Sequence, residues 1–193
     1  MRSFRRRLFA IFLGAALTAC AQLAPGPPGA SRPAVLARED LSPGFVGFIG
    51  PKAQHAPPFL DTPGTNFYCL RSFLDRRTGA TTHQLYVSES YFGAERVWEA
   101  ARDRTGKALP FVSVSRDEIT CDPICSYVEE FAATLPESEL RAKPDGLAVT
   151  FAAHSGDQKI IRISGERITA QLAAIDARRN PAQPIAAFGT APP

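Results

Sequence analysis

The sequence lacks the features that most readily assign a protein to a class. Its N-terminal apolar run, Leu8 to Leu17, is too short to cross a bilayer as a helix, which needs about 20 apolar residues. No repeat occurs at a period typical of solenoid proteins. The nucleophile motifs GxSxG and SxxK are absent, and the glycines are scattered among turns. These absences exclude a membrane-spanning helix in this run and a repeat architecture. They also exclude an active site built on the common serine nucleophile motifs, and a phosphate-binding loop.

The first nineteen residues have the order of an export signal. Four arginines form a positive segment before the apolar run, which ends in Leu17-Thr18-Ala19-Cys20. This length and these flanks are typical of a cleavable secretory signal. The pair Arg5-Arg6 is also compatible with a twin-arginine signal, but adjacent arginines are expected in any basic N-terminal segment.

The tetrapeptide that ends at Cys20 resembles the lipobox of bacterial lipoproteins. The resemblance covers residues 1–20 and implies cleavage before Cys20, a diacylglyceryl group on its thiol, and acylation (palmitate) of the new amine. Two or more acyl chains give stable membrane anchoring. Ala21 follows Cys20, and the family rule then favours the outer membrane, on its periplasmic side. The alternative is an ordinary signal peptide with Cys20 in a disulfide.

Removal of this segment changes the charge balance. The whole chain has 22 basic and 19 acidic residues. Without the four arginines of the signal, 18 basic residues remain against 19 acidic ones, a formal charge of −1. No net positive field remains to attract phosphate backbones, which excludes nucleic-acid binding.

Composition divides the chain into five parts. Residues 1–19 are the signal peptide, and residues 20–38 are a lipidated tether with a flexible Ala-, Gly- and Pro-rich spacer. Residues 39–65 form an irregular Pro-rich arm with one short strand at Phe45–Ile49; the alternative is that this arm binds a partner. Residues 66–178 form a compact β domain, and residues 179–193 form a Pro-rich tail.

Strand-forming segments in the compact part are separated by short turns. The first hairpin joins 67–74 to 83–88, a second joins 97–101 to 111–115 across a Gly106 turn, and a third joins 147–153 to 159–163. Residues 119–131 form strands around an Asp122-Pro123 turn. In the second hairpin Trp98 would face the core, and the competing prediction is a helix over Glu95–Arg104. One or two helical turns are expected over 135–141.

Short connections without long crossover helices favour antiparallel pairing. Ile168, Leu172 and Ile175 recur at helical spacing with polar residues between them. The expected fold is therefore mainly β (all-β to α+β): an antiparallel sheet, sandwich or partial barrel with one C-terminal amphipathic helix.

Besides Cys20, the chain contains Cys69, Cys121 and Cys125. The cell envelope is oxidising, so disulfides form there. Loop entropy favours Cys69–Cys121, at about 4 kcal/mol against about 2 kcal/mol for the short loop. Proximity across a tight turn favours Cys121–Cys125, which is the predicted disulfide, with Cys69 a buried free thiol.

The sequence supplies neither a catalytic nor a metal-binding motif, and no cofactor is expected. A zinc site would need a second paired motif beside the CxxxC pair. His154-Ser155-Gly156-Asp157 contains triad residue types, but adjacent residues in a turn cannot adopt triad geometry. Glu129 and Glu130 lie on opposite faces of a strand, so they are not a paired acid and base. One of them is expected to face the core beside a partner such as Arg71.

The run Gln84–Val87, Tyr91-x-Gly93, Gly106 and the Cys121–Cys125 segment resembles uncharacterised lipoproteins of Gram-negative bacteria. This likeness covers about residues 66–175 and implies no activity. Membrane-anchored lysozyme inhibitors are similar in architecture only, because their inhibitory loop is absent. The sequence therefore favours a non-catalytic binding or assembly module for an envelope protein, glycan or lipid. Its exposed aromatic patch would come from Tyr86, Tyr91, Phe92 or Trp98.

The alternative is a periplasmic metal-binding protein or hydrolase. Its site would be assembled from distant residues such as Cys69, His83 and His154. A site of this kind requires these three side chains to converge in one cleft.

Overall fold

The computed structural model describes residues 34–39 and 44–180. The expected signal peptide, Cys20, residues 21–33 of the spacer and most of the C-terminal tail lie outside the described residues. Within the described ranges, no helix combines the length and the apolar character needed to span a membrane.

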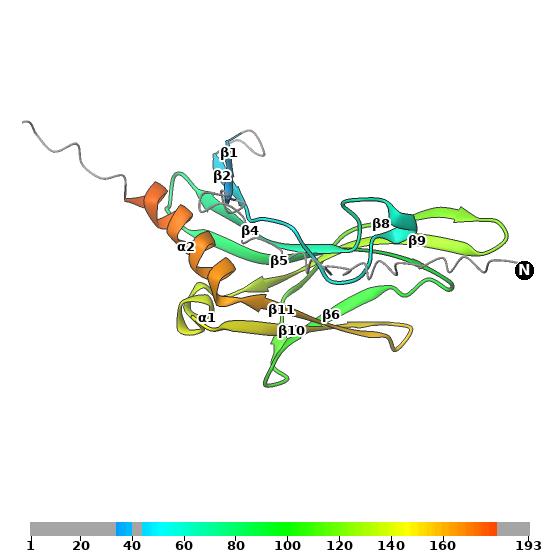
Figure 1. Ribbon diagram of the computed structural model, residues 1–193. Coiled ribbons are helices and arrows are strands. Elements are labelled where there is room, and N and C mark those ends of the chain that lie inside the picture. Colours follow the sequence, from blue (N-terminus) through cyan, green and yellow to red (C-terminus); the bar gives the residue numbers. More distant parts are fainter. Residues whose placement is uncertain (1–33, 40–43, 181–193) are drawn as a thin grey trace, which may run out of the picture. The chain divides into compact units, whose positions relative to one another are not determined.

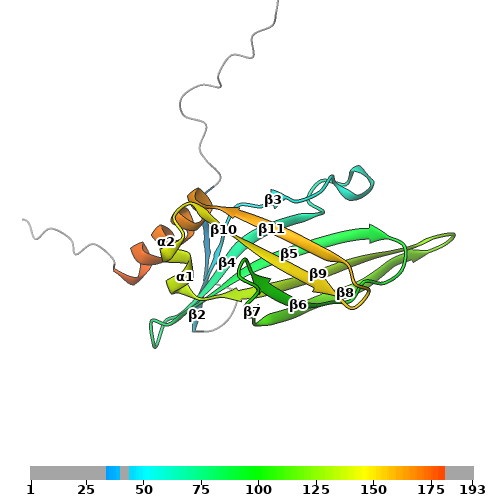
Figure 2. The same ribbon diagram turned by 90° about the horizontal axis from the view of Figure 1, so that it is seen from below.

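The described chain forms two antiparallel sheets with a helix at one end (Figure 1). This confirms the expected class, and the arrangement is sandwich-like rather than a closed barrel. The strands of the two sheets cross obliquely when they are seen from below (Figure 2).

Sheet A has the strand order β1-β2-β4-β5-β9-β8, with β3 paired to β4. Its long central strands alternate buried and less buried residues, as expected when one face of a sheet covers a core. The strands are β1 (Leu36–Arg38), β2 (Phe45–Ile49), β3 (Ala53–Gln54), β4 (Phe67–Asp75), β5 (Thr81–Phe92), β8 (Phe111–Cys121) and β9 (Cys125–Leu135).

Sheet B has the order β11-β10-β6-β7. Its strands are β6 (Trp98–Asp103), β7 (Ala108–Leu109), β10 (Gly146–Ala153) and β11 (Gln158–Ser164). Between the sheets lies the main core, in which Phe131 and Phe151 contact edge to face at 4.9 Å between ring centroids.

Three short helical segments complete the described chain. They are a 3-10 turn, η1 (Phe59–Asp61), and the helices α1 (Glu137–Ala142) and α2 (Gly165–Arg179). Ile168 and Leu172 of α2 pack into the main core, whereas Ile175 joins a second cluster with Val46 and Phe48 of β2. The predicted C-terminal amphipathic helix is confirmed, and it covers one end of the space between the sheets.

The predicted hairpins β4–β5, β8–β9 and β10–β11 are present. Residues from Trp98 onward form a strand, so the alternative helix over Glu95–Arg104 is wrong. The partner expected for this strand is wrong in part. The turn at Gly106 leads into β7, whereas Phe111–Ser115 belongs to β8 and pairs with β9 in the other sheet. Pro110 separates β7 from β8, and because proline has no N–H to give to a ladder, the chain changes sheets there.

The N-terminal part of the described chain contributes to sheet A. The short strand expected at Phe45–Ile49 is present as β2. The expected spacer extended to Arg38, but Leu36–Arg38 form β1, which pairs with β2. Val35 packs against the second core cluster, so the domain includes residues from the end of the Pro-rich stretch.

Candidate functional site

The carboxylate of Glu129 is buried between the two sheets. It accepts hydrogen bonds from the backbone N–H groups of Val97 and Trp98, each at 3.0 Å, and from the Tyr91 hydroxyl. The Arg116 guanidinium lies 3.4 Å from its second oxygen. Burial and the hydrogen bond to Glu129 raise the pKa of Tyr91 above its ordinary value. The carboxylate thus joins β5, β8 and β9 to the start of β6.

Glu89 lies opposite Glu129 in the β5–β9 register, on the same face of sheet A. One of its oxygens accepts a hydrogen bond from Arg96 at 2.7 Å and forms an ion pair with Lys159 at 3.0 Å. Its other oxygen is buried and has no hydrogen-bond partner among the described residues.

His55 extends this cluster to the N-terminal arm. Its Nε2 donates to the Ser88 carbonyl at 3.0 Å, and its Nδ1 accepts from Lys159 at 3.3 Å. Burial lowers the pKa of His55 to about 4, against the smaller opposing effect of the Ser88 hydrogen bond. A neutral histidine suits both contacts, because one ring nitrogen donates and the other accepts.

Two buried carboxylates side by side are the arrangement used for acid–base catalysis, but here each has its own structural partners. Arg96 and Lys159 neutralise Glu89, while Glu129 binds backbone groups that hold the β5–β6 connection. Neither carboxylate lines the pocket between sheet B and α1 or the pocket between α1 and α2. We therefore interpret the contacts of Glu89 and Glu129 as structural: they hold the two sheets together and do not form a reaction centre.

The sequence correctly predicted that one member of the Glu129-Glu130 pair would face the core. The expected partner was wrong, since Arg71 lies over the Tyr86 ring at 4.4 Å on the opposite face of the sheet. The pairing of Glu89 with Glu129 was missed. Alternation shows which face each residue takes, but not which residue of a distant strand lies opposite.

A second buried network lies beneath α2. The hydroxyl of Ser72 is 3.0 Å from His83 Nδ1, and His83 Nε2 is 3.2 Å from Glu137. Gln171 of α2 donates to Ser72 at 3.0 Å, and Arg179 binds both oxygens of Glu137. Burial lowers the pKa of His83, while Glu137 opposes this effect.

The order Ser72–His83–Glu137 matches the hydrogen-bond sequence of a serine, histidine and acid triad. However, Ser72 is 0% exposed and His83 is 1% exposed, and Gln171 occupies the hydroxyl. A nucleophile must reach a substrate, so this network stabilises the fold and does not form a triad site.

The residues named for a metal or hydrolase site do not converge. Cys69 and His83 lie on opposite faces of the β4–β5 hairpin, by the alternation of paired residues Cys69/Tyr86 and Ser72/His83. His154 lies in the exposed β10–β11 turn beside Glu99, at 3.6 Å. Over the described residues, no cluster of three or more His, Cys, Asp or Glu side chains could hold a metal ion.

The cysteines are arranged as the sequence predicts. Cys121 and Cys125 face each other at the end of the β8–β9 hairpin and lie at disulfide distance. Cys69 is a buried free thiol, and burial raises its pKa.

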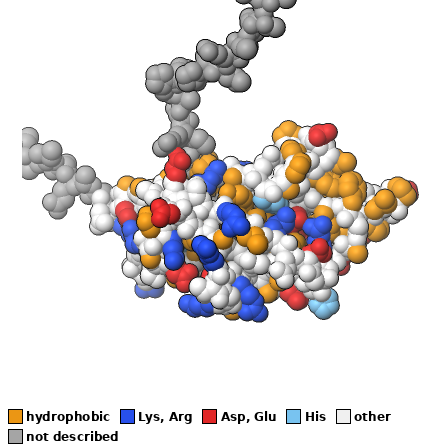
Figure 3. All heavy atoms as spheres, turned by 60° about the horizontal axis from the view of Figure 1, so that its bottom comes forward, with side chains coloured by type: hydrophobic (Ala, Val, Ile, Leu, Met, Phe, Trp, Pro, Cys, Tyr) orange, Lys and Arg blue, Asp and Glu red, His pale blue; other side chains and the backbone are white. Residues whose placement is uncertain are grey.

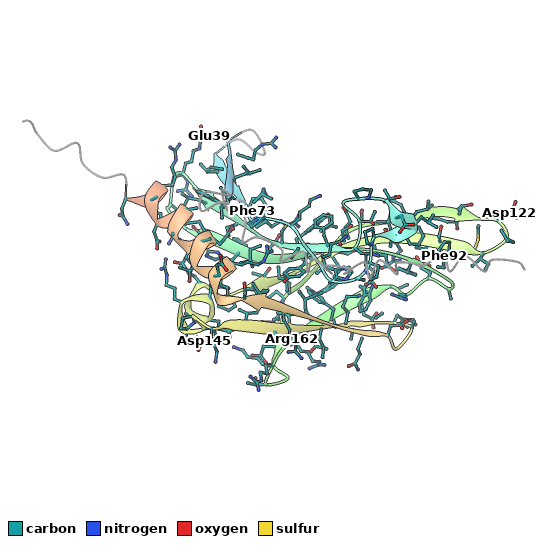
Figure 4. All side chains as sticks on the ribbon, in the orientation of Figure 1. Glu39, Phe73, Phe92, Asp122, Asp145 and Arg162 are labelled. Atoms are coloured by element: carbon teal, nitrogen blue, oxygen red, sulfur yellow. A yellow bond between two sulfur atoms is a disulfide. The ribbon has the colours of Figure 1, made fainter. Side chains whose placement is uncertain are left out.

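Exposed apolar side chains gather at the same end of sheet A. We define the apolar tip as Leu60, Phe92, Ile119 and Ile124. The Phe92 ring packs at a tilt against that of Phe59, which precedes Leu60, with 4.7 Å between the ring centroids. The N–H of Gly93 donates to the Cys125 carbonyl at 2.9 Å. The space-filling view shows the hydrophobic side chains of this end at its right (Figure 3), and Phe92 and Asp122 are labelled there in Figure 4.

The expected aromatic patch is therefore correct only at Phe92. Trp98 is buried and stacks on Phe131 at 5.1 Å, and Tyr91 is buried against Glu129. Tyr86 is half-buried beneath Arg71. Aliphatic residues supply the rest of the exposed apolar surface, which sequence reasoning missed because single exposed isoleucines in strands are common.

Comparison with known protein families, with curated proteins and with solved structures found no match for this chain.

Proposed function

We propose that this chain is a lipid-anchored envelope protein, attached through Cys20, that docks a partner protein with its apolar tip. The observation that carries the proposal is the exposure of the tip. Leu60, Phe92, Ile119 and Ile124 are 69%, 51%, 50% and 58% exposed, respectively. Several exposed apolar side chains at one end of a domain are typical of an interaction site.

The charges around the tip indicate the chemistry of the partner. Every charged residue in the segments 59–64 and 117–124 is acidic and exposed: Asp61, Asp117, Glu118 and Asp122. Carboxylates repel anionic lipid surfaces and nucleic acid, and they favour a cleft bordered by lysine or arginine. The proposed partner is a protein with an apolar cleft and a basic rim.

The tip is held in one shape before binding. The Cys121–Cys125 pair closes the hairpin, and the Phe59–Phe92 contact fixes the η1 turn against β5. A surface ordered in advance loses less entropy on binding, and this favours affinity.

The position of the tip also suits an anchored protein. The first described strand, β1, pairs with β2, and β2 pairs with β4. This part of β4 lies opposite Thr81–Gln84, at the beginning of β5. The tip lies at the other end of β5, beyond Tyr91. At about 3.3 Å per residue, these positions are about 25 Å apart along the strand. The beginning of the described chain and the apolar tip therefore lie at opposite ends of sheet A.

Site-specific photocrosslinking tests the proposal in the native host. A benzophenone amino acid replaces Ile124 in the tip or, as a control, Ile160 on β11, which is 56% exposed. We expect a discrete adduct from position 124 alone, and its partner to bind purified protein less tightly at high salt. The substitutions Asp117→Lys and Asp122→Lys should each reduce this adduct. Equal adducts from both positions, or an adduct that charge reversal leaves unchanged, would overturn the proposal.

A further inference from the structure

A pocket of about 500 Å³ lies away from the apolar tip, between sheet B, the β6–β7 turn and α1. Four aliphatic side chains form its floor: Leu109, Leu135, Val149 and Ile163. All four are less than a tenth exposed. Its volume falls within the range of about 300–1,000 Å³ that is usual for small-molecule sites.

The pocket exists because two neighbouring strands differ in extent. β6 ends at Asp103, opposite Val149, whereas β10 begins three residues earlier at Gly146. Residues 146–148 therefore pair with β11 on one side and, in the described part of the chain, meet no strand on the other. At the start of β10, Gly146 lies very close to the backbone of β11. A Cβ at this position would lie 2.3 Å from the Ile163 carbonyl oxygen, so only glycine fits here.

The rim of the pocket carries three cationic side chains, Arg104, Lys143 and Arg162. All three are exposed, and no ion pair or side-chain hydrogen bond ties them to other described residues. Lys and Arg side chains are prominent on this face of the molecule (Figure 3), and Arg162 is labelled on it in Figure 4.

The acidic residues of the rim are mostly engaged elsewhere. Asp103 accepts hydrogen bonds from the backbone N–H groups of Thr105 and Lys107 within its own turn. Glu139 lies 3.6 Å from Lys107. Asp145 is the remaining carboxylate, so the three cationic side chains outnumber the rim carboxylates whose oxygens are free to bind them.

From this floor and rim we infer that the pocket binds a small amphiphilic anion, with its apolar part on the aliphatic floor and its charge among Arg104, Lys143 and Arg162. Charged hydrogen bonds to lysine or arginine strengthen anion binding, and the apolar floor contributes through burial of surface. This inference is independent of the docking function proposed for the tip.

Three probes of equal chain length test the inference by calorimetric titration: octanoate, octan-1-ol and octylammonium. The full chain carries Cys20→Ala, so that no attached acyl chain competes. We expect octanoate to bind at least about tenfold more tightly than octan-1-ol, and octylammonium most weakly. Equal affinity for the three probes, or preference for octylammonium, would overturn the inference.

Two variants locate the binding. Replacing Arg104, Lys143 and Arg162 together by Gln should reduce the affinity for octanoate to that for octan-1-ol, without changing the latter. The matched control replaces Lys52, Arg76 and Arg77 by Gln and should retain the preference. Ala148→Phe, at a half-exposed position that lines the pocket, should abolish binding of all probes with little change in melting temperature. Unchanged octanoate binding in this last variant would place the ligand elsewhere and contradict the inference, even if the triple variant failed to fold.

Discussion

At the scale of single residues, the two buried networks show how this fold satisfies polar groups in its interior. Glu129 accepts from the backbone of Val97 and Trp98, whose N–H groups would otherwise have no acceptor at the start of β6. Val97 adopts a positive φ of 60°, which is unusual for a β-branched residue. The carboxylate therefore stabilises a backbone conformation that the local sequence disfavours.

The substitution Glu129→Ala is expected to destabilise the protein by about 3 kcal/mol, because it leaves buried donors without an acceptor. The control is Glu130→Ala, since Glu130 is half-buried on the opposite face and should lose less than about 1 kcal/mol. Urea unfolding monitored by Trp98 fluorescence measures both. Similar losses in the two variants would contradict the assigned role.

Stability is expected to fall as the pH decreases from 6.5 toward 4, the interval between the ordinary and the lowered pKa of His55. The folded protein holds this side chain neutral, whereas the unfolded chain binds a proton first, so acid favours unfolding. The lowered pKa of His83 acts in the same direction. In His55→Gln, the free energy of unfolding should change less over this interval than in the wild type. Identical pH dependence in the two proteins would contradict this assignment.

Residue-level features could be predicted where they are local in sequence. Cys121 and Cys125 are four residues apart around an Asp-Pro turn, so their proximity follows from the turn alone. Glu89 and Glu129 are forty residues apart, and their meeting depends on the register of β5 against β9. A shift by one residue would move either carboxylate to the opposite face, and nothing local in the sequence specifies that register.

At the scale of elements, α2 joins parts of the fold that are distant in sequence. Ile168 and Leu172 belong to the main core, while Ile175 is fully buried against β2 and β4. The side-chain amide of Gln171, on the same helix, donates a hydrogen bond to the carbonyl of Phe48 in β2 at 3.0 Å. The helix therefore attaches the N-terminal strands to the rest of the domain.

Ile175→Ala is expected to destabilise the protein by about 2–5 kcal/mol, the usual range for removing a fully buried aliphatic side chain. Arg178→Ala is the control. Its ion pair with Glu39 joins two side chains that are each about half exposed, so it should contribute less than about 1 kcal/mol. Hydrogen exchange should also show faster opening of β2 in the Ile175 variant. Protection of β2 equal to that of the wild type would contradict the proposed attachment.

The strands and the C-terminal helix could be predicted because periodicity and turn residues specify them locally. The assignment of strands to sheets could not be predicted in full. Phe111–Ser115 has the pattern of a strand, but the break at Pro110 decides that it leaves sheet B for sheet A. The pocket was not predicted either, since it depends on the difference in extent between β6 and β10.

At the scale of the whole molecule, the proposed anchor and the proposed docking surface make separate predictions. Metabolic labelling with an alkyne-bearing palmitate should modify the wild type and not Cys20→Ala. Cys69→Ala is the matched control and should retain the label, because Cys69 is buried. A label that survives in Cys20→Ala would contradict lipidation at that residue.

The strand β8 at the edge of sheet A affects how copies of this protein behave at high local concentration. β8 pairs along one side with β9 and is largely exposed. Its register is interrupted between Ser113 and Ser115 and between Glu118 and Thr120, and it carries Arg116 and Asp117. Irregular, charged edges resist sheet-to-sheet aggregation. Among the described strands β8 has no second partner, but these features disfavour its pairing with the β8 of another copy. The apolar tip of each molecule would then stay accessible to a different protein.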